Sequence, residues 1–114
     1  MYKSYQIHIY LKQKTKIVIG RLGTYIFPKG FYIYTGSAIR NFNSRIQRHL
    51  SNKKKMYWHI DYFLKSNNAK ILKIKKSHIP ECKLNKRIVG SIICNDFGSS
   101  DCKYYCYSHL KLIH

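Results

Sequence analysis

A strand that ends in Thr-Gly-Ser and leads directly into a helix is the feature that most constrains the fold of this chain. Residues 30–38 read Gly-Phe-Tyr-Ile-Tyr-Thr-Gly-Ser-Ala, so Tyr32 and Tyr34 share one face of the predicted strand. The helix that follows places Arg45 and His49 one turn apart on a common face. We therefore expect phenols, a guanidinium and an imidazole to lie together, an arrangement suited to binding a phosphate.

The rest of the pattern predicts one α+β domain over residues 1–114. Strict alternation over residues 5–11 predicts a strand with Tyr5, Ile7, Ile9 and Leu11 pointing inward. We expect a small mixed or antiparallel sheet flanked by helices, with the strands of Tyr5 and Tyr34 as neighbours. Further strands are predicted at residues 17–19, which return after a turn, and at 31–35 and 71–74. Helices are predicted from Asn41 or Asn43 to about residue 50, at 58–64, and at 79–89, where Gly90 ends the helix.

The charge is strongly one-sided, with 22 Lys and Arg against four acidic residues and a formal net charge of +18. Such an excess repels itself in a folded chain and favours a polyanionic partner. Nucleic acid is the first candidate, supported by an aromatic fraction of 15%, and an anionic membrane surface is the second. A general abundance of lysine is the alternative explanation.

No apolar run approaches the roughly 20 residues of a membrane span, and the N-terminus lacks an apolar signal core. We therefore expect a cytoplasmic protein with no membrane partner and with reduced cysteines.

Residues 34–38, Arg45, Ile46 and His49 resemble the second motif and the following helix of the GIY-YIG endonucleases. The chain is more closely similar to a small branch known as DUF123, or Uri-type endonuclease-like proteins. In the first motif, residues 4–6, only Tyr5 is kept. The segments that match the branch, in order, are 20–23, 27–30, 32–38, 48–50, 58–62, 81–82, 97–102 and 108–110.

The resemblance implies a GIY-YIG-like fold and a metal-dependent nuclease that hydrolyses phosphodiester bonds in DNA, with branched or damaged DNA as a candidate substrate. Glu81, the only glutamate, would hold one Mg²⁺ or Mn²⁺ ion. Arg45 would present its planar guanidinium to the phosphate oxygens. The alternative for Glu81 is stabilisation of a helix N-terminus.

By the same resemblance, Tyr5 and Tyr34 would position or deprotonate the attacking water, and His49 and His59 would orient the phenols or pass protons. A free phenol titrates near ~10, so a base role requires that nearby cations or metal-bound water lower its pKa. Both tyrosines could instead be core residues with their hydroxyls at the rim. His59 has a purely structural alternative as well.

Binding to nucleic acid is expected to rest on phosphate contacts from Arg48, Lys53, Lys54 and Lys55. DNA is the expected partner and RNA is an alternative. A second function class is a nucleic-acid-binding module that keeps a nuclease fold, has little activity and tethers a DNA-repair or RNA-processing protein.

Cys102, Cys106 and His109 lie close together near the C-terminus, and Cys82 or Cys94 could complete a tetrahedral zinc site. Their spacing matches no familiar zinc-finger pattern, so the sequence does not favour zinc. Asp101 lies in a run of small residues that could form a polar turn.

Overall fold

The computed structural model describes residues 2–38, 42–51, 58–98 and 106–113, with the backbone alone at Phe42. These ranges form an α+β fold, which confirms the predicted fold class. No helix within them is long and apolar enough to cross a membrane. In chain order the elements are β1 (Ser4–Leu11), β2 (Thr15–Val18), the 3-10 turn η1 (Gly20–Leu22), β3 (Thr24–Phe27), β4 (Gly30–Ser37), α1 (Phe42–Leu50), α2 (His59–Leu64), β5 (Ala69–Ser77), α3 (Glu81–Lys86) and β6 (Leu110–Ile113).

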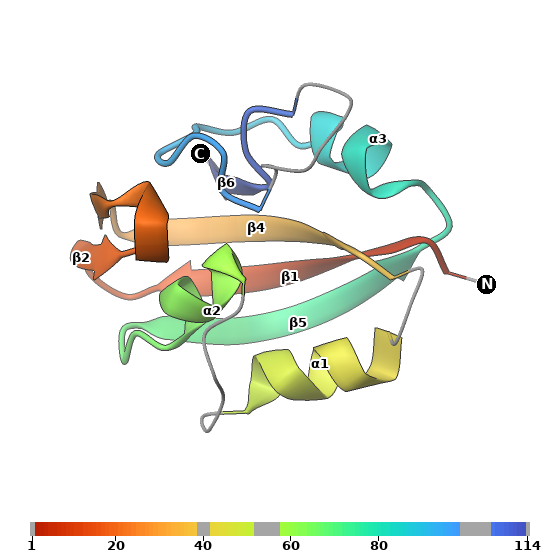
Figure 1. Cartoon of the computed structure of the whole chain (residues 1–114), viewed down its shortest axis with the longest axis horizontal. Coiled ribbons are helices and arrows are strands. Elements are labelled where there is room, and N and C mark those ends of the chain that lie inside the picture. Colours follow the sequence, from red (N-terminus) through yellow and green to blue (C-terminus); the bar gives the residue numbers. More distant parts are fainter. Residues whose placement is uncertain (1, 39–41, 52–57, 99–105, 114) are drawn as a thin grey trace.

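A four-stranded antiparallel sheet with the order β5-β1-β4-β6 forms the centre of the molecule (Figure 1). β1 pairs with β4 so that Ile7 lies opposite Tyr34 and Tyr5 lies opposite Gly36. The prediction that the strands of the two tyrosines are neighbours is confirmed. The four inward positions predicted for residues 5–11 are all buried, as the alternation of a strand requires.

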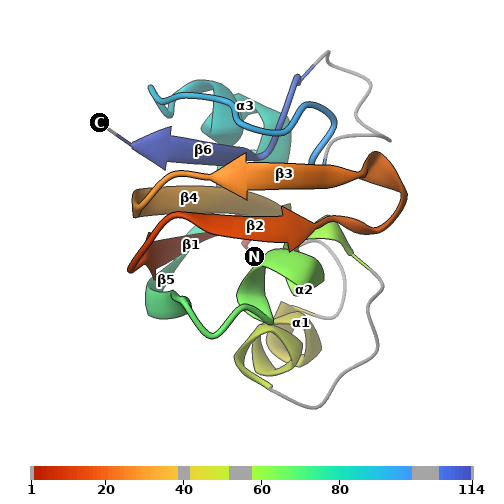
Figure 2. The ribbon, with the colours of Figure 1, turned by 90° about the vertical axis from the view of Figure 1, so that its left-hand side faces the viewer.

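The segment after β1 forms a separate hairpin of β2 and β3, which Figure 2 shows in front of β1 and β4. The expected strand at residues 17–19 therefore exists as β2, but it pairs with β3, a strand that the sequence analysis did not predict. Phe27 at the end of β3 explains the difference. Its ring packs on Phe63 of α2, with ring centroids 5.1 Å apart, and so anchors the hairpin to the core.

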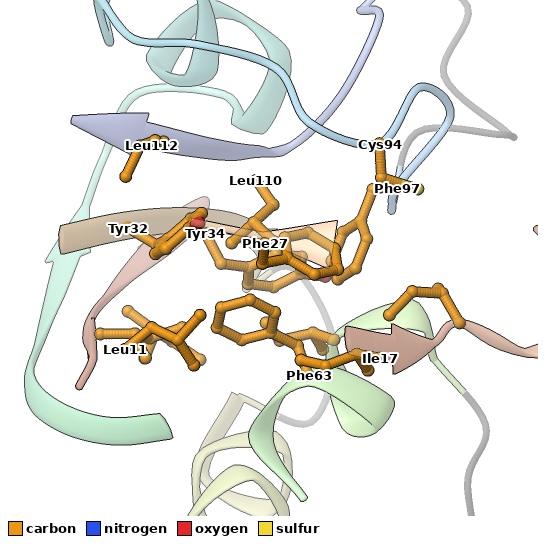
Figure 3. Packing of buried hydrophobic residues seen from close by; sticks show 14 of the residues in the cluster. Leu11, Ile17, Phe27, Tyr32, Tyr34, Phe63, Cys94, Phe97, Leu110 and Leu112 are labelled. Atoms are coloured by element: carbon orange, nitrogen blue, oxygen red, sulfur yellow. The ribbon is translucent and has the colours of Figure 1, made fainter. Parts of the chain in front are cut away.

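The core lies between the sheet, the hairpin and α2 (Figure 3). Phe27, Tyr32 and Phe63 form edge-to-face pairs with centroid distances of 5.1–6.2 Å. Each such pair contributes ~0.5–1.5 kcal/mol beyond the area that it buries. This buried aromatic cluster fixes α2 against one end of the sheet.

The predicted helix at residues 79–89 is shorter in the structure, where α3 covers Glu81–Lys86. The chain leaves the helix because it joins β6: Ser91 forms a bridge with Leu112, and Gly90 lies so close that a Cβ there would be 2.5 Å from the Leu112 carbonyl oxygen. Lys111 of β6 donates to the carbonyls of Asn85 and Ile88 and so satisfies the end of the helix. α1 and α2 lie toward β5, and α3 lies toward β6 (Figures 1 and 2).

Candidate active site

Two phenols from paired strands meet at one end of the sheet. Tyr5 of β1 and Tyr34 of β4 have ring centroids 6.4 Å apart, and they are 1% and 7% exposed. Gly36 makes room for the first ring, because a Cβ at this position would lie 2.5 Å from the Tyr5 ring. The glycine of Thr-Gly-Ser is therefore required for the Tyr5 ring to pass across β4.

α1 brings an imidazole and a guanidinium to the phenols. The Tyr5 hydroxyl lies 2.6 Å from His49 Nε2, and the His49 ring is also 6.2 Å from the Tyr34 ring. Arg45 Nη1 donates to the Ser37 carbonyl oxygen over 3.1 Å, at the end of β4. The predicted pair on one helix face is thus found beside both tyrosines.

Trp58 holds this group from the other side. The guanidinium carbons of Arg45 and Arg48 lie 4.9 and 5.1 Å from the centroid of its ring, within the range of a cation–π contact. The His49 ring is 5.7 Å away. The Trp58 backbone N–H donates to Asp61 Oδ2 over 2.9 Å at the start of α2, which fixes the platform on which Arg45 rests.

Arg48 forms a salt bridge of 2.9 Å with Asp61, whose side chain is 0% exposed. A buried carboxylate without this partner would be strongly destabilising, so Arg48 has a structural role. The guanidinium of Arg48 already neutralises Asp61, and its expected contact with phosphate stays a prediction. The other expected phosphate contacts, Lys53, Lys54 and Lys55, lie outside the described residues, as does Asp101.

Glu81 lies at the same end of the sheet, in the first turn of α3. Its negative charge raises the pKa of both Tyr5 and Tyr34, which places it beside the phenols. Burial raises the pKa of Glu81 itself, while Arg45 and a backbone hydrogen bond from Ser37 lower it. The Glu81 side chain remains 28% exposed and can therefore be reached from solvent.

Burial raises the pKa of Tyr5 well above its ordinary value, although Arg45 acts in the opposite direction. Burial also raises the pKa of Tyr34, and Tyr5 and Glu81 add to the effect. Arg45 acts in the direction that a base role requires, but desolvation outweighs it, so the condition for a phenolate base is not met. Both phenols are therefore neutral hydrogen-bonding groups at physiological pH.

His59 belongs to the neighbourhood of the site rather than to its centre. Its Nδ1 accepts a hydrogen bond of 2.8 Å from the Gly98 backbone N–H, and its ring is 5.8 Å from Phe97. Phe97 in turn lies 6.3 Å from the Tyr34 ring. His59 thus holds the turn at residues 97–98, and Phe97 of this turn packs near Tyr34.

Three residues gain roles that the sequence analysis did not assign: Trp58 as the platform, Gly98 as a spacer and His109 as a neighbour of Glu81. Gly98 has φ +66°, and a Cβ there would lie 3.1 Å from the Tyr34 ring. His109 Nδ1 is 3.6 Å from Glu81 Oε2, and burial lowers the pKa of His109 to about 4. The sequence does show an aromatic residue before a predicted helix and a glycine in a turn-rich segment. Neither feature indicates which side chain it contacts.

The assembled site offers a guanidinium, two neutral phenols, an imidazole and one solvent-accessible carboxylate. These groups can bind an anion, exchange protons and hold a hard cation. A family model described as "Domain of unknown function DUF123" matches residues 4–114 of the chain. No curated protein and no solved structure matches it.

Proposed function

We propose that this chain, which belongs to the DUF123 family, is a divalent-metal-dependent nuclease that hydrolyses phosphodiester bonds in DNA and is related to the GIY-YIG endonucleases. One observation carries the proposal. Tyr5, Tyr34, Arg45, His49 and Glu81 come from β1, β4, α1 and α3, yet they converge at one end of the sheet.

Arg45 is suited to binding the scissile phosphate. A guanidinium has five N–H donors in a rigid fork, and hydrogen bonds to Ser37 and Tyr5 engage only part of it. The Trp58 ring fixes the plane of the group. Arg45 can therefore direct its remaining donors at two phosphate oxygens and stabilise the charge that develops on them.

The Tyr5–His49 hydrogen bond supplies a route for the proton of the attacking water. A phenol this buried does not ionise readily, so a phenolate base is unfavourable. Tyr5 can instead accept the water proton on its oxygen while passing its own proton to His49 Nε2, which lies 2.6 Å away. The phenol stays neutral throughout, and His49 carries the proton. Tyr34 packs against both rings and orients them.

Glu81 fits one hard cation. Its side chain is partly withdrawn from water, and its pKa is raised by burial, so an additional positive charge would be stabilising there. The side chain retains the exposure that an ion and its water ligands need. A bound Mg²⁺ or Mn²⁺ would polarise the phosphate and lower the pKa of a bound water.

DNA is the partner that best suits the charge of +18. Exposed lysines follow β5, and two of them, Lys75 and Lys76, pair with Gln6 and Tyr5 at the end of the sheet that carries the site. The lysines of β5 would compensate the negative charge of a phosphate backbone that lies along this strand and leads to Arg45.

A binding module without cleavage is the second candidate, and the burial of the phenols favours it. With Tyr5 and Tyr34 at 1% and 7% exposure, a substrate reaches Arg45 and Glu81 more readily than it reaches the hydroxyls. Such a protein would bind DNA or RNA through the basic surface and recruit a repair protein.

The deciding experiment incubates the protein with labelled linear, flapped and branched DNAs, and with matched RNAs, in Mg²⁺, in Mn²⁺ and in chelator. We expect cleavage that requires a divalent ion and is lost in Glu81→Gln, while binding persists. Asp96→Asn is the matched control, because it removes one exposed carboxylate elsewhere. Cleavage by Glu81→Gln at the wild-type rate would contradict the metal assignment, and binding without cleavage of any substrate would support the binding module.

A further inference from the structure

Three metal-ligating side chains lie together next to Glu81. Cys82 follows Glu81 in α3, and Cys106 and His109 come from the segment that leads into β6. One ligand atom from each lies within 4.8 Å of the other two, and Cys82 Sγ is 4.0 Å from His109 Nε2. Neither cysteine forms a disulfide. The group therefore joins two elements that are distant in sequence.

We infer that Cys82, Cys106 and His109 bind a zinc ion that ties α3 to β6 and fixes the position of Glu81. Two thiolates and one imidazole are the donors that zinc prefers, whereas Mg²⁺ and Mn²⁺ prefer oxygen. In a tetrahedral site with ordinary Zn–S and Zn–N bonds, neighbouring ligand atoms lie about 3.5–3.8 Å apart. Side-chain rotations that move the ligand atoms by about 1 Å would convert the observed group into such a site. The fourth position is then left for water or a further ligand.

The surroundings of His109 have the form expected around a zinc-bound imidazole. The residue is 1% exposed, and its two nitrogens face different partners: Nε2 faces Cys82, and Nδ1 lies 3.6 Å from Glu81 Oε2. A histidine that ligates a metal through one nitrogen commonly donates the other N–H to a carboxylate, which fixes its tautomer. Lys111 interacts electrostatically with Cys106, and a nearby ammonium favours the thiolate.

The zinc site is distinct from the cation site proposed at Glu81. In this arrangement Glu81 orients His109 and does not ligate the zinc. The spacing of the ligands along the chain did not favour zinc. The fold brings Cys82 of α3, one of the two cysteines that the sequence left open as a further ligand, next to Cys106 and His109. The test reads metal binding and not DNA cleavage, so its outcome is separate from that of the nuclease proposal.

Metal-stripped, reduced protein is titrated with Zn²⁺ against a chromophoric chelator, and separately with Co²⁺. We expect one tight zinc per chain and the visible absorption of tetrahedral cobalt with thiolate ligands. Cys82→Ser and Cys106→Ser should lose both, whereas Cys94→Ser, which alters a buried cysteine outside the group, should keep both. Glu81→Gln should keep one zinc with affinity lowered by roughly 10–100-fold, as expected for a partner that orients a ligand.

Alkylation mapping of the wild-type protein keeps the test independent of whether the variants fold. Zinc should protect Cys82 and Cys106 from alkylation, a chelator should restore their reaction, and the reactivity of Cys94 should not change with zinc. Zinc that binds without protecting these two thiols would overturn the inference. So would a Cys94→Ser variant that loses the metal, or a Cys82–Cys106 disulfide in place of metal binding.

Discussion

Tyr32 and Tyr34 stand two residues apart on the same face of β4, yet they belong to two different regions. Tyr32 lies among the rings of Phe27 and Phe63, and its hydroxyl donates to the Pro28 carbonyl oxygen over 2.6 Å. Tyr34 lies beside Tyr5 and His49. One phenol completes a dry core, and the other borders a cluster of charged and titratable groups.

The difference teaches that a raised pKa does not by itself identify a functional tyrosine. Burial raises the pKa of Tyr32, Tyr34 and Tyr5 alike. Only Tyr5 pairs its hydroxyl with a group that can take up its proton, since Tyr32 bonds to a backbone carbonyl. The partner of the hydroxyl distinguishes the two regions.

A large effect that separates the regions is expected from Arg45→Ala. Loss of the guanidinium removes stabilisation of the phosphate oxygens, and one such donor is typically worth 10²–10³ in rate, so we expect a loss of ~10²–10³ in the single-turnover rate of DNA cleavage. Arg21→Ala is the control, because Arg21 is an exposed arginine at the hairpin. Equal rates for the two variants would remove Arg45 from the site.

Gly36→Ala tests whether the space beside Tyr5 matters for chemistry. The added Cβ would lie 2.5 Å from the Tyr5 ring, so the ring must shift, which disturbs its hydrogen bond to His49. We expect destabilisation of ~1–3 kcal/mol in chemical denaturation together with a cleavage rate that falls at least tenfold under folding conditions.

Gly23→Ala is the matched change in the other region. Gly23 has φ +108°, and a Cβ there would make only an ordinary contact with the Tyr25 ring at 4.0 Å, so the alanine is strained without touching the site. Similar destabilisation with unchanged cleavage is expected. If both alanine variants lose cleavage in proportion to stability, Gly36 has no specific role at the site.

The sequence predicted the part of the site that depends on local periodicity. Strand alternation and the helical spacing of Arg45 and His49 are sufficient to place those residues relative to Tyr34. It did not predict β3, β6 or the role of His109, because these depend on contacts between distant segments, such as Phe27 with Phe63 and Ser91 with Leu112. It did not predict the net direction of the phenol pKa shifts either, since charge can be read from composition whereas burial cannot.

A smaller effect should appear in DNA binding rather than in chemistry. Lys75→Glu/Lys76→Glu reverses two exposed charges of β5, and the logarithm of the association constant should then depend less steeply on the logarithm of salt concentration. Each lost phosphate contact lowers that slope by roughly 0.9. Fluorescence anisotropy from low to physiological salt measures it. An unchanged slope would show that DNA does not lie along β5.

The smallest effect is expected in alkaline stability. Because burial raises the pKa of Tyr32 above its unfolded value near ~10, the folded state keeps a proton that the unfolded chain releases. The contribution of Tyr32 to the free energy of unfolding is therefore complete below pH ~10. It is lost as the pH rises further, by at most ~1.4 kcal/mol per pH unit. Tyr32→Phe should make the free energy of unfolding, measured with urea, fall less steeply with pH. The measurement runs from roughly pH 9 to 11, a range that brackets the phenol pKa. An unchanged decline would show that Tyr32 titrates normally.

The most direct test of the proposed relay compares single-turnover DNA cleavage by Tyr5→Phe and Tyr32→Phe under conditions in which both variants are folded and bind DNA equally. Each substitution removes one buried hydroxyl and keeps the ring. Loss of a proton-transfer group is worth ~10²–10⁴ in rate, so Tyr5→Phe should fall by that factor while Tyr32→Phe cleaves at the wild-type rate. Cleavage by Tyr5→Phe at the wild-type rate would contradict the account.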